Sequence, residues 1–225
     1  MIKIIDYKAG NAPSVMHAIE KLGYRADFAR NAADLQGATH IILPGVGSAK
    51  ATMDSLSEMG LLSALEQAVL HEKVLFLGIC VGMQVLFDHS EEEDADCLGW
   101  LPGRVIKFDK STIRVPQMGW NSVEFLRNSS KAPPNAAKRS RICSVTPLQK
   151  YQMPPSDTPH TDHFYFVNSY YADPENPDDV WGLAEYGGLF CAAVKRGNIY
   201  GTQFHAEKSG TAGLALLDAF LRGEA

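Results

Sequence analysis

Residues 74–87 read Val-Leu-Phe-Leu-Gly-Ile-Cys-Val-Gly-Met-Gln-Val-Leu-Phe, and this stretch decides the fold of the chain. Its first part, residues 74–79, is a short apolar run of the kind that forms a strand buried on both faces of a parallel sheet. After Cys80 the apolar residues recur at helical spacing. The chain is therefore expected to pass from strand to helix at Cys80. Gly78 and Gly82 leave room for a sharp turn, as in the serine-centred Gly-x-Ser-x-Gly elbow.

Cys80 is the candidate nucleophile. A thiol at the start of a helix faces unpaired N–H groups, which favour the thiolate relative to a free cysteine with a pKa of about 8.5. A small buried apolar residue is the usual interpretation of a cysteine, but the strand-to-helix corner favours the nucleophile here. We assign structural roles to the other three cysteines, Cys97, Cys143 and Cys191. Because no pair has Cys-x-x-Cys spacing, zinc binding and dithiol redox chemistry are not expected, and no other metal or cofactor is implied.

The first half of the chain alternates expected strands with expected helices. The strands are expected at residues 2–6, 24–28, 40–43 and 74–79, and the helices at residues 12–22 and from about residue 49. Such alternation predicts a parallel, doubly wound sheet, which binds ligands at the carboxyl ends of its strands. Cys80 and Gly45 both fall at that edge.

The second half of the chain has a different pattern. Closely spaced segments rich in aromatic and β-branched residues predict hairpins and mixed pairing at residues 115–125, 164–171, 180–186, 189–195 and 199–204. A polar, proline-bearing segment at about 128–162 is interpreted as a surface excursion. Residues 210–221 are expected to form a closing helix that buries Leu214, Leu217 and Leu221. We therefore expect one α/β domain over residues 1–225, with a mostly parallel sheet and an added antiparallel region.

The composition excludes several classes of protein. The chain has 225 residues, of which 45% are hydrophobic, and can bury the core of one α/β domain. Its net charge of -5 gives no basic field for nucleic acid. No apolar run approaches the roughly 20 residues that a membrane span needs, and the first residues lead into a strand rather than a signal peptide. A cytoplasmic setting with reduced thiols is the expectation.

A thiolate nucleophile needs a base, and His205 is the histidine whose position fits. It is expected at the end of the strand at residues 199–204, at the sheet edge where Cys80 lies. Histidine can take a proton and return it near neutral pH. In extended backbone, residues i and i+2 project to the same side, so Glu207 is placed to orient His205. A solvated surface pair is the alternative for an isolated His-x-Glu, but the cysteine corner favours catalysis.

Six short motifs carry a family resemblance. Three of them resemble class I (triad) glutamine amidotransferases: Gly-Ile-Cys-Val-Gly-Met-Gln at 78–84, Pro-Gly-Val-Gly at 44–47 and Gln-Phe-His-Ala-Glu-Lys at 203–208. The others are similar to the glutaminase subunits of imidazole glycerol phosphate synthases: Asp-Tyr at 6–7 with Gly-Asn at 10–11, Met-Gly-Trp-Asn at 118–121 and Phe-Val-Asn-Ser-Tyr at 166–170. The resemblance covers about residues 1–127 and 163–222 and implies a flavodoxin-like fold.

The resemblance also implies a reaction, in which the side-chain amide of L-glutamine is hydrolysed through a thioester on Cys80. His205 would be base and acid, and Glu207 its orienter. Backbone N–H groups of Val81 and of Val46, in the loop at residues 45–47, would hold the oxyanion, and the conformation of this loop would decide between idle and active enzyme. The resemblance places five residues in the glutamine pocket: Gly47, Gln84, Glu92, Ser169 and Tyr170.

The implied partner is a cyclase, expected to be a (β/α)₈ barrel, that uses the ammonia to make imidazole glycerol phosphate in histidine biosynthesis. The two chains would form a heterodimer. Asn11, Trp120 and Lys208 are the residues expected to face this partner.

The sequence departs from the family pattern at four places, and two alternatives stay open. Ala206 stands where the family usually has proline, and Gln117 and Asn168 each stand for a usual histidine. The excursion at about 128–162 is longer than the family's connection. One alternative is a glutaminase that serves another ammonia-dependent synthase. The other is a non-catalytic regulatory module of the same fold.

Overall fold

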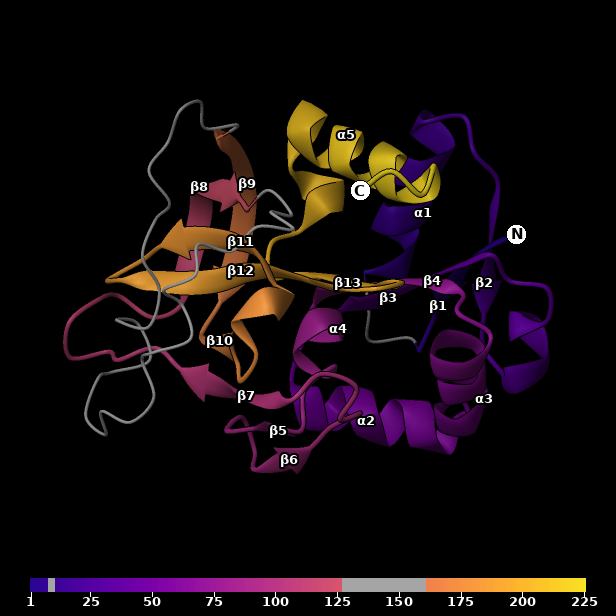
Figure 1. Cartoon of the computed structure of the whole chain (residues 1–225), viewed down its shortest axis with the longest axis horizontal. Helices are drawn as coiled ribbons and strands as arrows, with labels where there is room; N and C mark the ends of the chain where they lie inside the picture. The colour runs from indigo at the N-terminus through magenta and orange to yellow at the C-terminus, as the bar shows by residue number, and fades with distance from the viewer. Residues whose placement is uncertain (8–10, 127–160) are drawn as a thin grey trace.

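The computed structural model describes residues 1–7, 11–126 and 161–225, and its central feature is a mixed β-sheet (Figure 1). The parallel half contains β1 (Ile2–Ile5), β2 (Ala26–Ala29), β3 (His40–Gly45), β4 (Leu75–Cys80) and β13 (Ile199–Thr202). These strands lie in the order β2-β1-β3-β4-β13, which is the flavodoxin-like order. The sequence predicted all five strands, with ends that shift by up to two residues.

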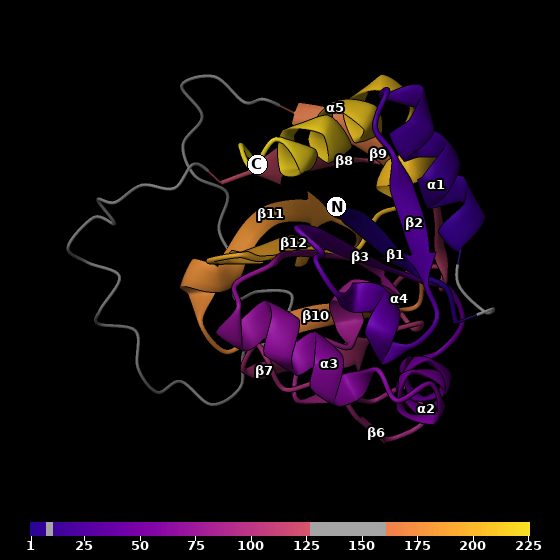
Figure 2. The same ribbon diagram turned by 90° about the vertical axis from the view of Figure 1, so that its right-hand side faces the viewer.

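Helices cover both faces of this parallel half. Figures 1 and 2 show α1 (Ala12–Lys21) and α5 (Gly210–Leu221) on one face, and α2 (Ala49–Glu58) and α3 (Leu62–Glu66) on the other. A π-helical turn at Gln67–His71 continues α3. The prediction for α5 is confirmed in its bounds. Its buried side is partly different, because Leu216 and Phe220 are buried and Leu214 is only partly so.

The predicted corner between strand and helix is present at Cys80. Its φ of 57° is a left-handed conformation that a residue other than glycine seldom adopts. The following helix, α4 (Val81–Gln84), lies directly on β3 and β4. A Cβ on Gly82 would lie 1.9 Å from the Leu43 carbonyl oxygen, and one on Gly78 would lie 2.2 Å from the Gly82 carbonyl oxygen. Glycine is therefore required at both positions for this close approach.

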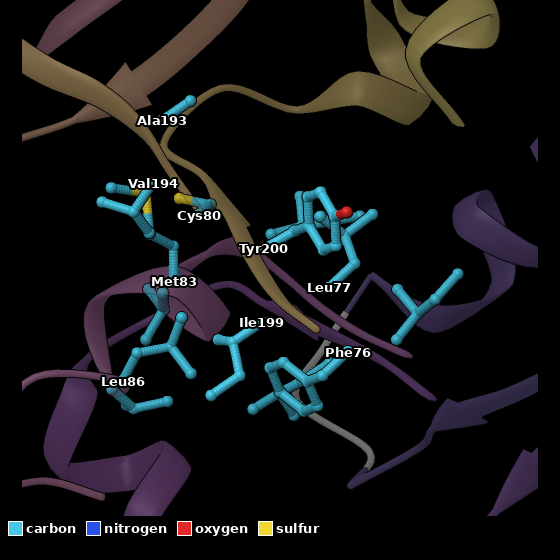
Figure 3. Packing of buried hydrophobic residues seen from close by; sticks show 14 of the residues in the cluster. Phe76, Leu77, Cys80, Met83, Leu86, Ala193, Val194, Ile199 and Tyr200 are labelled. Carbon is cyan, nitrogen blue, oxygen red and sulfur yellow. The ribbon is translucent and has the colours of Figure 1, made fainter. Parts of the chain in front are cut away.

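The helix after Cys80 is shorter than the sequence pattern predicts. It ends at Gln84 because the next carbonyl groups bind a loop instead of a further helical turn. The Leu86 carbonyl accepts the N–H groups of Trp100 and Leu101, both at 2.9 Å. Figure 3 shows Met83 and Leu86 among the buried side chains of the core, which also includes Phe76 and Ile199. The apolar spacing after Cys80 thus reflects core packing rather than a long helix.

The second half adds the antiparallel region that the sequence predicted. It contains β8 (Gln117–Phe125), β9 (Thr161–Asn168), β10 (Tyr170–Pro174), β11 (Val180–Glu185) and β12 (Leu189–Arg196). The strand expected at 164–171 is two strands, because the chain changes partner at Ser169: β9 pairs with β8, and β10 pairs with β7 and β12.

Three strands were not predicted: β5 (His89–Ser90), β6 (Ala95–Asp96) and β7 (Gly103–Lys107). The first two are too short to show a periodic pattern. The excursion expected at 128–162 lies outside the described residues except for its last two, which belong to β9. Among the residues described, no helix is long and apolar enough to cross a membrane.

Candidate active site

The candidate site lies at the carboxyl ends of the parallel strands. Gly45 at the end of β3 is in register with Cys80 at the end of β4, and Thr202 at the end of β13 is in register with Ile79. His205 follows β13 by three residues. The residues expected at one edge of the sheet are therefore brought together there.

Cys80, His205, Glu207 and Asn11 form a line of polar contacts. His205 lies close enough to Cys80 for the sulfur to raise the pKa of its imidazole. On the other side of the ring, Nδ1 of His205 lies 2.8 Å from Oε1 of Glu207, and both side chains are almost fully buried. Oε1 also accepts a hydrogen bond of 2.7 Å from the side-chain amide of Asn11. Among the described residues, the second carboxylate oxygen of Glu207 has no hydrogen-bond partner.

The backbone from His205 to Glu207 is not extended throughout, which corrects the premise of the prediction. His205 is itself extended but caps a 3-10 turn, Ala206–Lys208, which carries Glu207, and the predicted contact forms at the start of this turn. The hydroxyl of Ser209 donates to the His205 carbonyl at 2.6 Å and accepts from the Tyr165 N–H at 3.0 Å. These bonds tie the turn to β9. Ala206, where the family usually has proline, is fully buried.

The surroundings of His205 raise the pKa of its imidazole to about 10. Desolvation is the largest single effect and lowers the pKa. The hydrogen bonds and charges of Cys80 and then Glu207 act in the opposite direction and prevail. The geometry therefore favours an imidazolium between a sulfur and a carboxylate. Such an ion can give a proton to a leaving group.

Cys80 has two further polar neighbours. Its thiol lies 3.9 Å from the Val167 carbonyl oxygen, and the side-chain nitrogen of Gln203 lies 3.7 Å from its sulfur. The side-chain oxygen of Gln203 accepts from Gln84 at 3.0 Å. Gln203 was not predicted from the sequence, although alternation along the chain from Gln203 to His205 was a usable signal.

A cavity of about 320 Å³ opens beside Cys80 and His205. All five residues predicted for the glutamine pocket line it: Gly47, Gln84, Glu92, Ser169 and Tyr170. Pro116, Val167 and Asn168 also line it and were not predicted to. Gln84 is nearly fully buried and donates to the Tyr170 carbonyl as well as to Gln203, so it also fixes other groups of the wall.

Glu92 supplies the acidic group of the cavity. Its carboxylate accepts the N–H of Ala49 at 3.3 Å, at the first turn of α2. Burial raises the pKa of Glu92, and the hydrogen bond from Ala49 partly offsets this. A half-buried carboxylate with few donors suits a cationic ligand group such as an ammonium.

The two residues predicted for the oxyanion also line the cavity. Val81 is the first residue of α4. Val46 is 37% exposed, and its backbone lies close enough to the Tyr7 hydroxyl to lower the pKa of that phenol, although burial raises the pKa by more. Tyr7 also contacts the Thr52 hydroxyl at 3.4 Å. The peptide that precedes Gly47 is therefore bordered by a buried phenol that the sequence analysis did not identify.

The residues predicted to face a partner lie in two different settings. Lys208 is exposed and lines the cavity. Trp120 is 58% exposed. Met118, its neighbour on the same face of β8, is 66% exposed. Asn11, in contrast, directs its side chain to the buried Glu207. The side chain of the half-buried Asn11 thus supports the polar line, and its contact with a partner stays a prediction.

Gln117 and Asn168, which stand for usual histidines, pair across β8 and β9 beside the cavity. Both are nearly fully buried. Within residues 1–7, 11–126 and 161–225, neither side-chain oxygen has a hydrogen-bond partner. The amide nitrogen of Asn168 donates to the Tyr170 carbonyl at 3.0 Å.

The fold and this arrangement of residues are consistent with an amidotransferase, and the chain belongs to the family described as Glutamine amidotransferase class-I, which matches residues 3–222. The imidazole glycerol phosphate synthase subunit HisH of Leptospira interrogans is 40% identical over 224 residues, which cover 98% of each chain. The subunit HisH 1 of Campylobacter jejuni (strain RM1221) is 39% identical over 224 residues, which cover 99% of this chain and 100% of the relative.

Solved structures share the fold. A crystal structure of a glutamine amidotransferase superposes with a TM-score of 0.70 at 17% identity and covers 98% of this chain and 97% of its own. The structure of PurLQS from Thermotoga maritima gives a TM-score of 0.70 at 16% identity and covers 100% of this chain and 98% of its own. The predicted fold class and family are confirmed.

Proposed function

We propose that this chain is the glutaminase subunit of an imidazole glycerol phosphate synthase. It hydrolyses L-glutamine to glutamate and ammonia and supplies the ammonia to a cyclase in histidine biosynthesis. The observation that carries the proposal is the buried line of Cys80, His205 and Glu207 at the wall of the cavity. The similarity to HisH subunits over nearly the full chain supports the particular synthase.

The proposed reaction begins with the Cys80 thiolate. Its sulfur attacks the amide carbon of glutamine, and the carbonyl electrons move to the oxygen, which backbone N–H groups of Val81 and Val46 hold. His205 gives its proton to the leaving nitrogen, the C–N bond breaks, and ammonia departs, which leaves a thioester on Cys80. A water then attacks the thioester and gives a proton to His205, and glutamate leaves. Glu207 keeps the imidazole oriented and stabilises its cationic form.

Substrate orientation follows from the groups around the cavity. Glu92 is the partner of the substrate ammonium, since burial leaves this carboxylate poorly solvated. Gly47, Gln84, Ser169 and Tyr170 shape the wall. Losing one oxyanion donor typically costs about 2.7–4 kcal/mol of transition-state stabilisation, so the conformation of the loop that holds Val46 controls the rate strongly. We therefore expect the isolated chain to be nearly idle.

The cyclase partner docks at the exposed surface beside the cavity. Trp120, Met118 and Lys208 are the residues that we assign to this surface, because they are exposed and Lys208 also reaches the cavity. Tryptophan and methionine are common at interface cores. This chain and the cyclase form a heterodimer. The need for a reduced thiolate fits a cytoplasmic location.

The test is glutamate release by the purified chain, with and without candidate cyclases and their nucleotide ligand. We expect low release alone and a rise of roughly a hundredfold or more with the matching cyclase. Cys80→Ala should abolish release and keep ammonia-dependent cyclase activity. A glutamine-like diazo-ketone should label Cys80. Release that no cyclase changes, or that only another synthase stimulates, would assign the chain to a different system, and no release with any partner would indicate a regulatory module.

A further inference from the structure

Gln203 is a buried polar residue that the proposed reaction does not yet use. It follows β13, and its exposure is 0%. Its backbone N–H donates to the Ala192 carbonyl at 2.8 Å, which holds the residue in line with β12. A buried carboxamide without partners is costly, so the contacts of its side chain indicate what it does.

The orientation of the Gln203 side chain is fixed by Gln84. The side-chain nitrogen of Gln84 donates to two oxygens, the Tyr170 carbonyl at 3.2 Å and Oε1 of Gln203 at 3.0 Å. A backbone carbonyl can only accept, so the group of Gln84 that faces it must be the amide nitrogen. That nitrogen in turn requires the oxygen of Gln203 to face it. The NH₂ group of Gln203 is left to face Sγ of Cys80, at 3.7 Å.

The sulfur of Cys80 therefore has two donors of different kinds. His205 is a donor that loses its proton during the reaction. Gln203 is a donor that cannot lose its own, since a carboxamide does not titrate near neutral pH. A hydrogen bond to a thiolate is stronger than one to a thiol or a thioester, because the ionised sulfur carries the charge. The Gln203 donor thus stabilises the thiolate relative to both other states.

We propose that Gln203, oriented by Gln84, is a positioning residue that stabilises the Cys80 thiolate; this inference rests on the proposed function. The thiolate occurs twice in the cycle. It is the nucleophile at the start, and it is the leaving group when the thioester is hydrolysed. In that second step, water adds to the carbonyl carbon and gives a proton to His205. The C–S bond then breaks and its electron pair stays on sulfur. The N–H of Gln203 donates a hydrogen bond to the sulfur as it becomes a thiolate.

The experiment measures the rate of Cys80 alkylation by iodoacetamide against pH, by mass spectrometry of the Cys80 peptide in the full chain. Gln203→Met keeps a similar volume and removes the donor. We expect the midpoint of its pH profile to rise by about one pH unit, because a hydrogen bond to a charged group is worth about that much. Gln84→Met leaves the donor present but unoriented and should give a smaller rise.

The matched control is Gln117→Met. Gln117 is a nearly buried glutamine beside the same cavity, with no described contact to Cys80. The midpoint of Cys80 alkylation in Gln117→Met should equal that of the unchanged chain. Near-ultraviolet circular dichroism establishes that each variant is folded. If Gln203→Met does not fold, the alkylation midpoint of Gln84→Met alone tests the inference.

An unchanged midpoint in folded Gln203→Met, or in folded Gln84→Met where the first variant cannot be used, would overturn the inference. A rise of the same size in Gln117→Met would also overturn it, because any buried amide would then have the effect. Alkylation needs only the thiol and not glutamine turnover. A chain without glutaminase activity whose midpoint still rises therefore contradicts the proposed function and leaves the role of Gln203 intact.

Discussion

The elbow that carries Cys80 and the turn that carries His205 and Glu207 are both fixed, but by different forces. The elbow, residues 78–84, is fixed by contact: Gly82 lies against the backbone of β3, and Gly78 lies against Gly82. The turn that carries the proposed acid–base pair, residues 205–209 and called the acid–base turn below, is fixed by hydrogen bonds from Ser209 and Asn11. The elbow should therefore be sensitive to volume and the turn to lost donors and acceptors.

The two kinds of restraint also suit two kinds of group. A nucleophile must be held at one point, and close packing against backbone gives that, since packed interiors hardly compress. An acid–base pair must change its charge during each turnover, and polar partners stabilise both charge states. The difference between the regions predicts which substitutions damage each, from the largest effect to the smallest.

The largest effect on stability is expected for Gly82→Ala. A Cβ at this position would lie 1.9 Å from the Leu43 carbonyl oxygen, so α4 would have to move away from β3. We expect a loss of more than about 3 kcal/mol in the free energy of unfolding, together with slower labelling of Cys80. Urea denaturation and the labelling rate measure the two effects.

The control is Gly197→Ala, in the turn between β12 and β13. Its φ is 58°, and no described atom lies within 4 Å of a Cβ built there, so this variant carries backbone strain without crowding. The strain should cost about 1–2 kcal/mol. Equal losses in the two variants would contradict the role of close packing at the elbow.

The elbow was predictable from sequence because its signals are local. An apolar run, two glycines and one cysteine lie within a few residues, and the structure places them as expected. Helix α4 was predicted too long because core packing of Val85 and Leu86 imitates a helical pattern. The local pattern predicted the position of the corner. It did not predict the loop whose N–H groups bind the carbonyl of Leu86.

The acid–base turn was only partly predictable. The pair His205 and Glu207 was identified on an extended backbone, whereas in the structure a 3-10 turn begins directly after His205. The contact of Asn11 with Glu207 joins residues 196 positions apart. No periodicity or motif spacing reports such a contact, because it depends on how α1 and α5 pack on the same face of the sheet. Gln203 was missed although it stands in the same motif as His205.

The second prediction compares the two members of the acid–base turn by activity. His205→Asn removes the base and acid and should lower glutamine hydrolysis with the partner by about a thousandfold or more. Glu207→Gln removes only the orienter and the charge. Its rate of hydrolysis should fall by a factor that is roughly ten to a hundred times smaller than the factor for His205→Asn. Steady-state glutamate release in the presence of the cyclase gives both values. A larger loss in Glu207→Gln would reverse the assigned roles.

The third prediction concerns the charge on His205. The pKa of this imidazole is raised to about 10, and its interaction with the Cys80 sulfur is the first of the effects that raise it. In Cys80→Ala the pKa should fall, as nuclear magnetic resonance of the imidazole nitrogens against pH would detect. A pKa that Cys80→Ala leaves unchanged would mean that the elbow and the turn are not coupled.

The same pKa predicts a dependence of stability on pH. A folded-state pKa above the unfolded value of about 6.5 stabilises the protein fully below pH 6.5, and this stabilisation is lost as the pH rises toward 10. The difference in unfolding free energy between the unchanged chain and His205→Asn should therefore shrink between pH 6.5 and 10. Urea denaturation at several pH values measures it. A difference that grows over this range would give the opposite sign of coupling.

The smallest effect is expected for Asn11→Ala. This variant removes one hydrogen bond to Oε1 of Glu207 and leaves the contact between Glu207 and His205 in place. Losing a hydrogen bond to a charged group costs about 1.5–3 kcal/mol. The Glu207 carboxylate would also be held less firmly in its orientation toward His205. We expect glutamate release with the cyclase to fall by roughly tenfold, with little change in the affinity for the partner.

Asn11→Asp separates this role from a role at the partner surface. The aspartate would place a second carboxylate beside a buried one, and like charges at that distance oppose each other. If Asn11 acts through Glu207, Asn11→Asp should be more damaging than Asn11→Ala at neutral pH, and activity should partly recover as the pH falls and one carboxylate is protonated. If Asn11 instead acts at the interface, both variants should weaken binding of the cyclase and leave diazo-ketone labelling of Cys80 in the isolated chain unchanged. The labelling rate and the affinity for the cyclase, measured on the same two variants, decide between a residue that supports the acid–base turn and one that contacts the partner.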